Sequence, residues 1–255
     1  MLFDAHLHII DPAFLLQENN GFLPDPFTVA DYQERVRGFD VRGGAVVSGS
    51  FQGFDQTYLT DAMRRLGPGF VGVTQLPADT PDEEIRELAD AGVRAVRFNL
   101  KRGGSAGLED LDHFARRVFE VAGWHTELYI DTRTVAADAA LRRTIATLPA
   151  VSIDHLGMHA DGLPQLCELV EAGVHVKATG FGRVELDPAR AMAEILRVNP
   201  GALMVGTDVP STRAKRPFRE SDLDLIRQTV GEAVGDSAVE DVFYNNAARW
   251  YRVAD

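Results

Sequence analysis

Eight short apolar runs alternate with segments of helical periodicity along this 255-residue chain. The strand-like runs occupy residues 2–8, 43–49, 70–76, 95–100, 126–131, 151–157, 174–180 and 202–208. Helical patterns between them include residues 81–92, 108–123 and 161–173, and each of these three closes on glycine. Strands and helices that alternate through about 250 residues are typical of an α/β fold of the (β/α)₈ TIM-barrel type. A doubly wound sheet is the alternative.

Composition limits the domain organisation and the partners. The chain is 45% hydrophobic, enough for a full core, and no Pro-, Gly- or Ser-rich linker divides it, so we expect one domain over residues 1–255. The formal net charge of −12 repels nucleic acid and anionic membrane surfaces. No signal peptide or membrane-spanning run is evident, so we expect a cytoplasmic protein that acts on a small molecule. The oligomeric state is left open.

Polar residues stand at or near the ends of several predicted strands. In a TIM barrel the strands are buried on both faces, and the residues at their carboxyl ends line the active site. Such positions are held here by His8, Arg97 with Asn99, Tyr129 with Asp131, His155, Lys177 and Asp208. These residues therefore mark the expected mouth of the barrel.

The first strand, LFDAHLH, carries polar residues at alternating positions. Strand geometry predicts that Asp4, His6 and His8 share one face, while the apolar residues between them face the other way. His155 follows the sixth strand and Asp208 the eighth, which neighbours the first in a closed barrel. We therefore expect three imidazoles and one carboxylate to meet at the mouth.

Two kinds of chemistry suit this group. His6, His8 and Asp208, with His155 as a further ligand, can bind Zn²⁺ and activate a water molecule. Alternatively, the three histidines polarise a substrate carbonyl while Asp208 takes a proton from water. Both end in hydrolysis, and Asp4 and Asp154 are candidates for orienting the histidines.

The stretches DAHLH (residues 4–8), IDHLG (153–157) and GTDVP (206–210), in this order, resemble the amidohydrolase superfamily. The closer resemblance, over nearly the whole chain, is to the amidohydrolase 2 branch with its 2-pyrone-4,6-dicarboxylate lactonases and sugar lactonases. This likeness implies a TIM barrel that hydrolyses a cyclic ester.

The resemblance also implies substrate-binding residues. The segments 92–104, 123–131 and 174–184 are similar to those that supply substrate arginines and a tyrosine in the lactonases, which points to Arg97, Arg102, Tyr129 and Arg183. Physical chemistry agrees, because a guanidinium fork pairs bidentately with a carboxylate. The basic loop containing Arg213, Lys215 and Arg216 is interpreted as solvated and is left outside the predicted site.

The sequence departs from the family pattern in ways that bear on metal use and substrate. The predicted fifth strand has no histidine, and the fourth has Arg97 and Asn99 where binuclear members carry a lysine. Met158 with His159 replaces an arginine, and Phe27 stands near the position of a tyrosine. These departures argue against a binuclear site and against pyrone dicarboxylate itself as the substrate.

The sequence thus predicts a hydrolase that opens a lactone of a small carboxylated or polyhydroxylated molecule, without a required cofactor. Asp208 is the predicted base, and His6, His8 and His155 polarise the carbonyl. The first alternative is a Zn-dependent amidohydrolase or decarboxylase that uses these four residues as ligands. The second is a barrel that binds a ligand without turnover. The role of Lys177 is left open.

Overall fold

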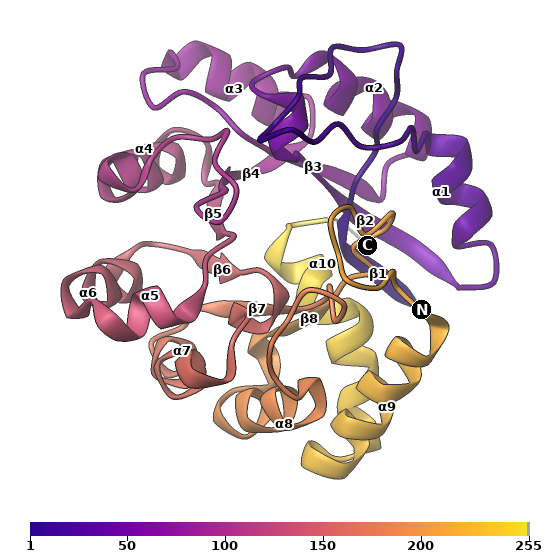
Figure 1. Ribbon diagram of the computed structural model, residues 1–255, viewed down its shortest axis with the longest axis vertical. Helices are drawn as coiled ribbons and strands as arrows, with labels where there is room; N and C mark the ends of the chain where they lie inside the picture. The colour runs from indigo at the N-terminus through magenta and orange to yellow at the C-terminus, as the bar shows by residue number, and fades with distance from the viewer. Residues whose placement is uncertain (254–255) are drawn as a thin grey trace.

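The computed structural model describes residues 1–253 and contains an eight-stranded parallel barrel in the order β1 to β8 (Figure 1). Backbone hydrogen bonds close it between β1 and the segment after β8, from Asp208 N to His6 O at 2.7 Å and from His8 N to Val209 O at 2.9 Å. The predicted TIM barrel is therefore confirmed. The strands are β1 (Leu2–Leu7), β2 (Val41–Val47), β3 (Phe70–Thr74), β4 (Val93–Phe98), β5 (His125–Leu128), β6 (Val151–Ile153), β7 (His175–Ala178) and β8 (Leu203–Val205).

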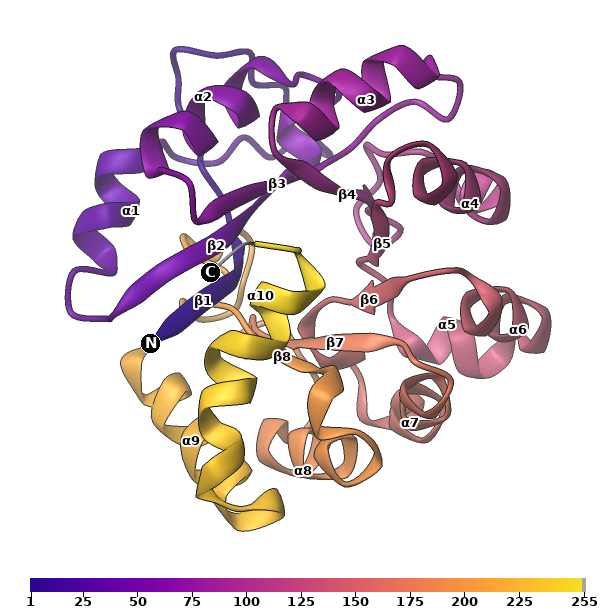
Figure 2. The same cartoon turned by 180° about the vertical axis from the view of Figure 1, so that it is seen from behind.

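Helices surround the barrel, and α10 lies across the end opposite the site (Figure 2). The three helices predicted from the sequence are confirmed as α3, α4 and α7. Acidic residues fill the first turn of α3, and α4 ends at Gly123, whose φ of 66° suits glycine. The α-helices are α1 (Val29–Arg35), α2 (Thr57–Leu66), α3 (Asp82–Asp90), α4 (Leu111–Ala122), α5 (Thr132–Ala137), α6 (Ala139–Thr147), α7 (Leu163–Glu171), α8 (Pro188–Val198), α9 (Glu220–Val234) and α10 (Asn246–Trp250).

The core has two parts. The larger one packs the outer faces of the strands against the helices. A smaller one fills the barrel towards α10, and its members include Phe3, Val47, Val73, Met204 and Tyr251. Other buried groups inside the barrel are charged, so this interior is not the purely aliphatic filling common in TIM barrels.

The predicted alternation along β1 is wrong at its first position. The pairing with β2 is irregular between Asp4 and Leu7. Asp4 pairs with Gly44 and Leu7 with Val46, so β1 advances by three residues while β2 advances by two. Ala5 belongs to the cluster inside the barrel and His6 also faces the interior, whereas Asp4 accepts from the Tyr32 hydroxyl of α1 at 3.1 Å. Asp4 therefore lies on the helix side. The extra residue in β1 shifts the alternation, as a β-bulge does.

Asp4 consequently does not orient the imidazoles, contrary to the expectation. Its carboxylate accepts from the backbone N–H of Thr207 at 2.8 Å and from the Thr207 hydroxyl at 2.7 Å. Burial raises the pKa of Asp4 to about 6, against the effect of these hydrogen bonds. Its role is to join β1 to the segment after β8.

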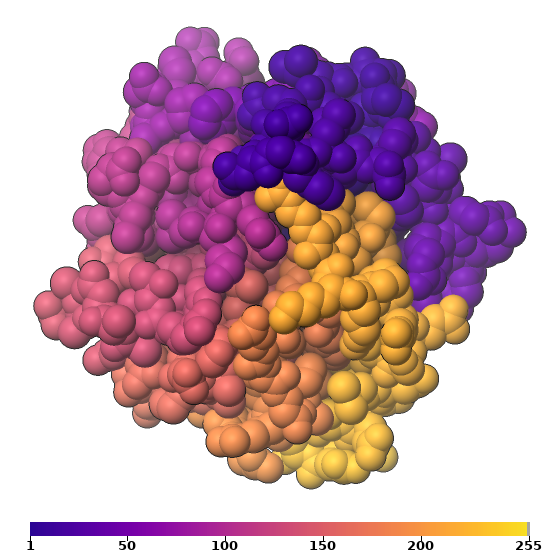
Figure 3. All heavy atoms as spheres, in the orientation of Figure 1, coloured from indigo at the N-terminus to yellow at the C-terminus, as the bar shows by residue number. Residues whose placement is uncertain are grey.

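The observed strands end earlier than predicted. β5 stops at Leu128 and β6 at Ile153, so Tyr129 and His155 stand in the following loops, while Arg97 remains within β4. Asp208 likewise comes after β8 has ended. The mouth is surrounded by N-terminal residues, the loop after β4 and the loop after β8 (Figure 3). Among residues 1–253, no helix has the length and apolar character needed to cross a membrane.

Candidate active site

The two histidines of the first strand lie one above the other inside the barrel. His6 is fully buried and His8 is 4% exposed, and their ring centroids are 5.0 Å apart. The His8 Nδ1 lies 2.7 Å from the carbonyl oxygen of Val47 in β2. Because a carbonyl can only accept, Nδ1 of His8 carries a proton, and in the neutral ring Nε2 keeps its lone pair.

His155 completes the group from the loop after β6. Its ring centroid is 4.9 Å from that of His6, and its backbone φ of 53° is in the left-handed region. A side chain at Gly180 would place its Cβ 2.5 Å from Nδ1 of His155, so only glycine allows the ring this position. Asp208 also has a left-handed φ, of 60°. Such conformations are frequent at active sites, where the surrounding structure holds them.

Asp208 faces both His6 in β1 and His8 directly after it. Its Oδ1 is 3.8 Å from Nε2 of His6 and 3.6 Å from Nε2 of His8. Burial on its own would raise the pKa of Asp208, but the charge of Arg183 beside it holds that pKa far below the usual range. Asp208 is therefore an ionised carboxylate over the whole neutral range.

His6 and His155 are neutral under the same conditions. The pKa of His6 is lowered to about 4, because the effects of burial and of the nearby Lys177 ammonium together outweigh the opposite effect of Asp154. Burial also holds the pKa of His155 well below its ordinary value. The structure thus brings together the four residues predicted as catalytic, with the neutral imidazoles of His6 and His155 beside an anion.

A buried ionic chain runs beneath this group. Arg97 donates to Oδ2 of Asp154 through Nε at 3.1 Å and NH2 at 2.9 Å, and its NH1 donates to the Ser48 carbonyl at 3.0 Å. Lys177 is fully buried and donates to Glu127 at 2.5 Å. Lys177 holds the pKa of Glu127 at about 2, although burial favours the neutral acid. All three nitrogens of the Arg97 guanidinium therefore already donate to buried acceptors of the protein.

A cavity opens over this group, with His8 and His155 in its lining, and four guanidinium groups also line it. Arg97 and Arg183 are paired with carboxylates, whereas among residues 1–253 no carboxylate lies within ion-pair distance of Arg102 or Arg213. Tyr129 lies at the same wall, with its ring 5.1 Å from the Arg97 guanidinium. Despite the acidic chain, this pocket is locally basic and suits an anionic ligand.

Arg213 is the lining residue that sequence reasoning left out. Its NH1 donates to the side chain of Asn19 at 3.1 Å, and its guanidinium lies 4.3 Å from the centroid of the Phe22 ring. The N-terminal segment thus fixes Arg213 over the mouth. In the sequence, the one sign that Arg213 belongs to the site is its position shortly after GTDVP. The residues that it contacts lie about 190 positions away in the sequence, so no local pattern reveals them.

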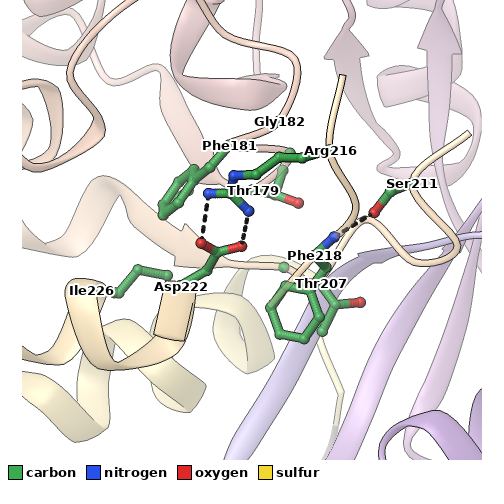
Figure 4. Close-up of a pocket in the computed structure, with 12 residues that line it drawn as sticks. Thr179, Phe181, Gly182, Thr207, Ser211, Arg216, Phe218, Asp222 and Ile226 are labelled. Atoms are coloured by element: carbon green, nitrogen blue, oxygen red, sulfur yellow. Dashed lines mark hydrogen bonds and ion pairs between the residues drawn. The ribbon is translucent and has the colours of Figure 1, made fainter. Parts of the chain in front are cut away.

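The other basic residues of that loop are not in the mouth. Arg216 lies in a separate crevice beside α9, where it forms a two-pronged pair with Asp222, at 2.9 and 2.7 Å (Figure 4). Ser211 accepts from the backbone N–H of Phe218 at 3.0 Å across the same crevice. Arg216 has its own carboxylate, so this crevice is not an anion site. Lys215 is 75% exposed and pairs with Glu185.

Two groups of buried side chains in the barrel could hold a metal ion. His6, His155 and Asp208 offer ligand atoms within 4.8 Å of one another, as do His6, Glu127 and Asp154. Imidazole and carboxylate are ligands that zinc accepts, and Nε2 of His6 is buried without a hydrogen-bond partner. The first group fits zinc better, because it offers two imidazoles, whereas the second offers one imidazole and has Lys177 3.5 Å from Asp154.

Comparisons with known proteins agree with this geometry. The chain is 27% identical to 4-sulfomuconolactone hydrolase of Rhizobium radiobacter over 98% of its own length and 89% of the relative. It is 27% identical to a 2-pyrone-4,6-dicarboxylate hydrolase of Comamonas testosteroni over 60% of this chain and 51% of that one.

A solved structure shares the fold. A probable 2-pyrone-4,6-dicarboxylic acid hydrolase from Acinetobacter baumannii, with citric acid bound, superimposes with a TM-score of 0.81 at 19% identity, covering 98% of this chain and 99% of that one. The amidohydrolase family model matches residues 3–253. The chain therefore belongs to the amidohydrolase family.

Proposed function

We propose that this protein is a hydrolase that opens the lactone ring of a small anionic molecule. The observation that carries the proposal is the carboxylate of Asp208 beside three imidazoles, beneath a cavity lined by four arginines. The named activities of the two curated relatives support it, since one hydrolyses a sulfomuconolactone and the other a pyrone dicarboxylate. The citric acid bound by the Acinetobacter protein supports a carboxylated ligand.

The reaction follows from the charges of the site. A water oxygen attacks the lactone carbonyl carbon, and Asp208 takes the proton that this water loses. The carbonyl oxygen becomes an oxyanion, which accepts hydrogen bonds from the imidazoles of His6 and His155. Collapse of this intermediate breaks the ring C–O bond, and the proton on Asp208 passes to the departing oxygen. The product is an open chain with one new carboxylate and one new hydroxyl group.

His8 takes a different part from the one first expected. Nδ1 of His8 donates its proton in a hydrogen bond to the Val47 carbonyl oxygen, so the neutral ring presents a lone pair at Nε2. In that state His8 accepts a proton or a hydrogen bond, and it donates from Nε2 only as an imidazolium. We therefore assign the donor role to His6 and His155 and an acceptor role towards water to His8.

The arginines bind the anionic group of the substrate. Arg102 and Arg213 are the most available, because their charges have no carboxylate partner among residues 1–253. Arg183 can contribute once the substrate shares its guanidinium with Asp208. We assign Arg97 to the support of Asp154 and treat Tyr129 as a wall of the cavity.

We propose that turnover needs no metal ion, because a lactone carbonyl is already reactive and the arginine cluster disfavours a dication. A zinc-dependent hydrolase or decarboxylase is the second candidate, supported by the unpartnered Nε2 of His6. In that case His6, His155 and Asp208 hold the ion, with His8 beside them. When bound, the metal supplies Lewis-acid polarisation and a more acidic water.

The proposal is tested by supplying lactones and measuring acid release at fixed pH. The set contains carboxylated, sulfonated, sugar-derived and neutral lactones of similar ring size, with the Asp208→Asn protein as a control for spontaneous hydrolysis. We expect an anionic lactone to be the best substrate. Binding of an anionic lactone without any turnover, with or without added Zn²⁺, would identify the protein as a non-catalytic binding barrel instead.

A further inference from the structure

His6 in β1 and His8 directly after it have partners of opposite kind at Nδ1. The partner of His8 is the carbonyl oxygen of Val47, a pure acceptor, at 2.7 Å. The partner of His6 is the ammonium nitrogen of Lys177, a pure donor, at 3.5 Å. Because a neutral imidazole has one N–H and one lone pair, opposite partners at Nδ1 select opposite tautomers.

Lys177 is held rigidly enough to make this selection. It is fully buried in β7, and its ammonium group lies 2.5 Å from Glu127, 3.5 Å from Oδ1 of Asp154 and 3.5 Å from Nδ1 of His6. An ammonium group has three N–H bonds, and three acceptors surround this one. Glu127 is held in turn by the Tyr251 hydroxyl at 2.5 Å.

Asp154 competes with Lys177 for Nδ1 of His6. Its Oδ1 is 3.4 Å from Nδ1 of His6 and 3.5 Å from the ammonium nitrogen of Lys177, while the contact from Lys177 to Nδ1 of His6 has hydrogen-bond geometry. The other oxygen of Asp154 is occupied by Arg97. When Oδ1 of Asp154 accepts from Lys177, Nδ1 of His6 is free to accept from the same ammonium group, and the ring proton is then on Nε2.

We propose that Lys177 is a positioning residue that keeps His6 in its Nε2–H tautomer, so that His6 donates to the lactone carbonyl. This inference rests on the proposed function. Nε2 of His6 is buried, lacks a partner within the described chain and lies 3.8 Å from Asp208, the base of the same reaction. A donor there stabilises the oxyanion while His8 presents a lone pair to water.

The same tautomer disfavours a metal ion at His6. A metal ligand needs the lone pair at Nε2, and ligating histidines usually give their Nδ1 proton to an acceptor, as His8 does. Lys177 prevents this arrangement at His6. Loss of Lys177 therefore has two opposite consequences, weaker catalysis and stronger metal binding, which a merely structural lysine would not produce.

The experiment begins with the tautomer. The protein is labelled with ¹⁵N-histidine, and the His6 signals are assigned by their absence from the His6→Gln variant. Three proteins are compared near pH 7, where His6 is neutral: the parent, the Lys177→Met/Glu127→Gln double variant and the Glu127→Gln control. The double variant removes both charges of the buried pair, which protects the fold, and melting curves confirm that all three are folded.

We expect protonated Nε2 in the parent and in the control, which keeps the ammonium beside His6. In the double variant we expect the proton to move to Nδ1, facing Asp154. The kcat for the best lactone should then fall about 10²-fold, with a smaller change in KM. The affinity for Zn²⁺, measured by competition with a chelator, should rise about tenfold.

Two results would overturn the inference: a parent His6 with its proton on Nδ1, or a double variant whose tautomer does not change. The NMR measurement needs no substrate, so it separates this inference from the proposed function. If the tautomers are as expected but no lactone is hydrolysed, the proposed activity fails while the assignment of Lys177 to the His6 tautomer stands.

Discussion

Arg183 donates to both carboxylate oxygens of Asp208, from Nε to Oδ2 at 2.6 Å and from NH2 to Oδ1 at 2.9 Å. The predicted general base is thus ionised but already paired. Arg183 is also the arginine that the sequence assigned to substrate binding. An incoming carboxylate that attracts Arg183 weakens its hold on Asp208, so substrate binding and activation of the base are expected to be coupled.

The pH dependence should reveal this pair. Arg183 holds the pKa of Asp208 low against the effect of burial, so Arg183→Met should raise that pKa. A base works only when deprotonated, and activity is lost as pH falls through its pKa. The acid limb of kcat should therefore move to higher pH. This acid limb is measured with a neutral lactone, on protein from which metal ions have been removed by a chelator. The Arg102→Met protein is the control. An unmoved acid limb in Arg183→Met would contradict this assignment.

Asp208→Asn should reduce kcat by about 10²-fold or more, because the amide cannot accept the proton of water. Melting temperature and circular dichroism should report a folded protein, since the amide still accepts a hydrogen bond from Arg183. The measurement is steady-state hydrolysis of the best lactone. Turnover close to that of the parent would remove Asp208 from the base role.

Arg97→Met and Arg102→Met form a matched pair. Arg97 satisfies buried Asp154, so its loss should lower the free energy of unfolding by about 3 to 5 kcal/mol and affect charged and neutral lactones alike. Arg102 has no such partner, so its loss should raise KM for the carboxylated lactone selectively and leave stability nearly unchanged. Denaturant unfolding and KM values decide. A selective KM effect at Arg97 would restore the anchor role that the sequence indicates.

Metal removal separates the two proposed forms of the chemistry. The protein is dialysed against a strong chelator until elemental analysis finds metal in less than about a tenth of the molecules. We expect lactone hydrolysis to persist. Activity that disappears and returns only with Zn²⁺ or Mn²⁺ would make His6, His155 and Asp208 metal ligands and overturn the metal-independent mechanism.

The sequence by itself determined the barrel and the members of its mouth. Periodicity separates strands from helices, and in a parallel barrel all strands end at the same side, so His8, His155 and Asp208 converge whatever their sequence distance. The resemblance to the amidohydrolase 2 branch added Arg102 and Arg183, and both line the mouth.

Only the tertiary structure decided what each side chain pairs with. The bulge in β1 turned Asp4 towards α1, Asp154 engaged Arg97, and Asn19 with Phe22 brought Arg213 to the mouth. In a regular strand the local pattern indicates which face a residue occupies, but it does not indicate which distant charge neutralises that residue. Burial makes an unpaired charge costly, so the final pairing is settled by the whole packed barrel.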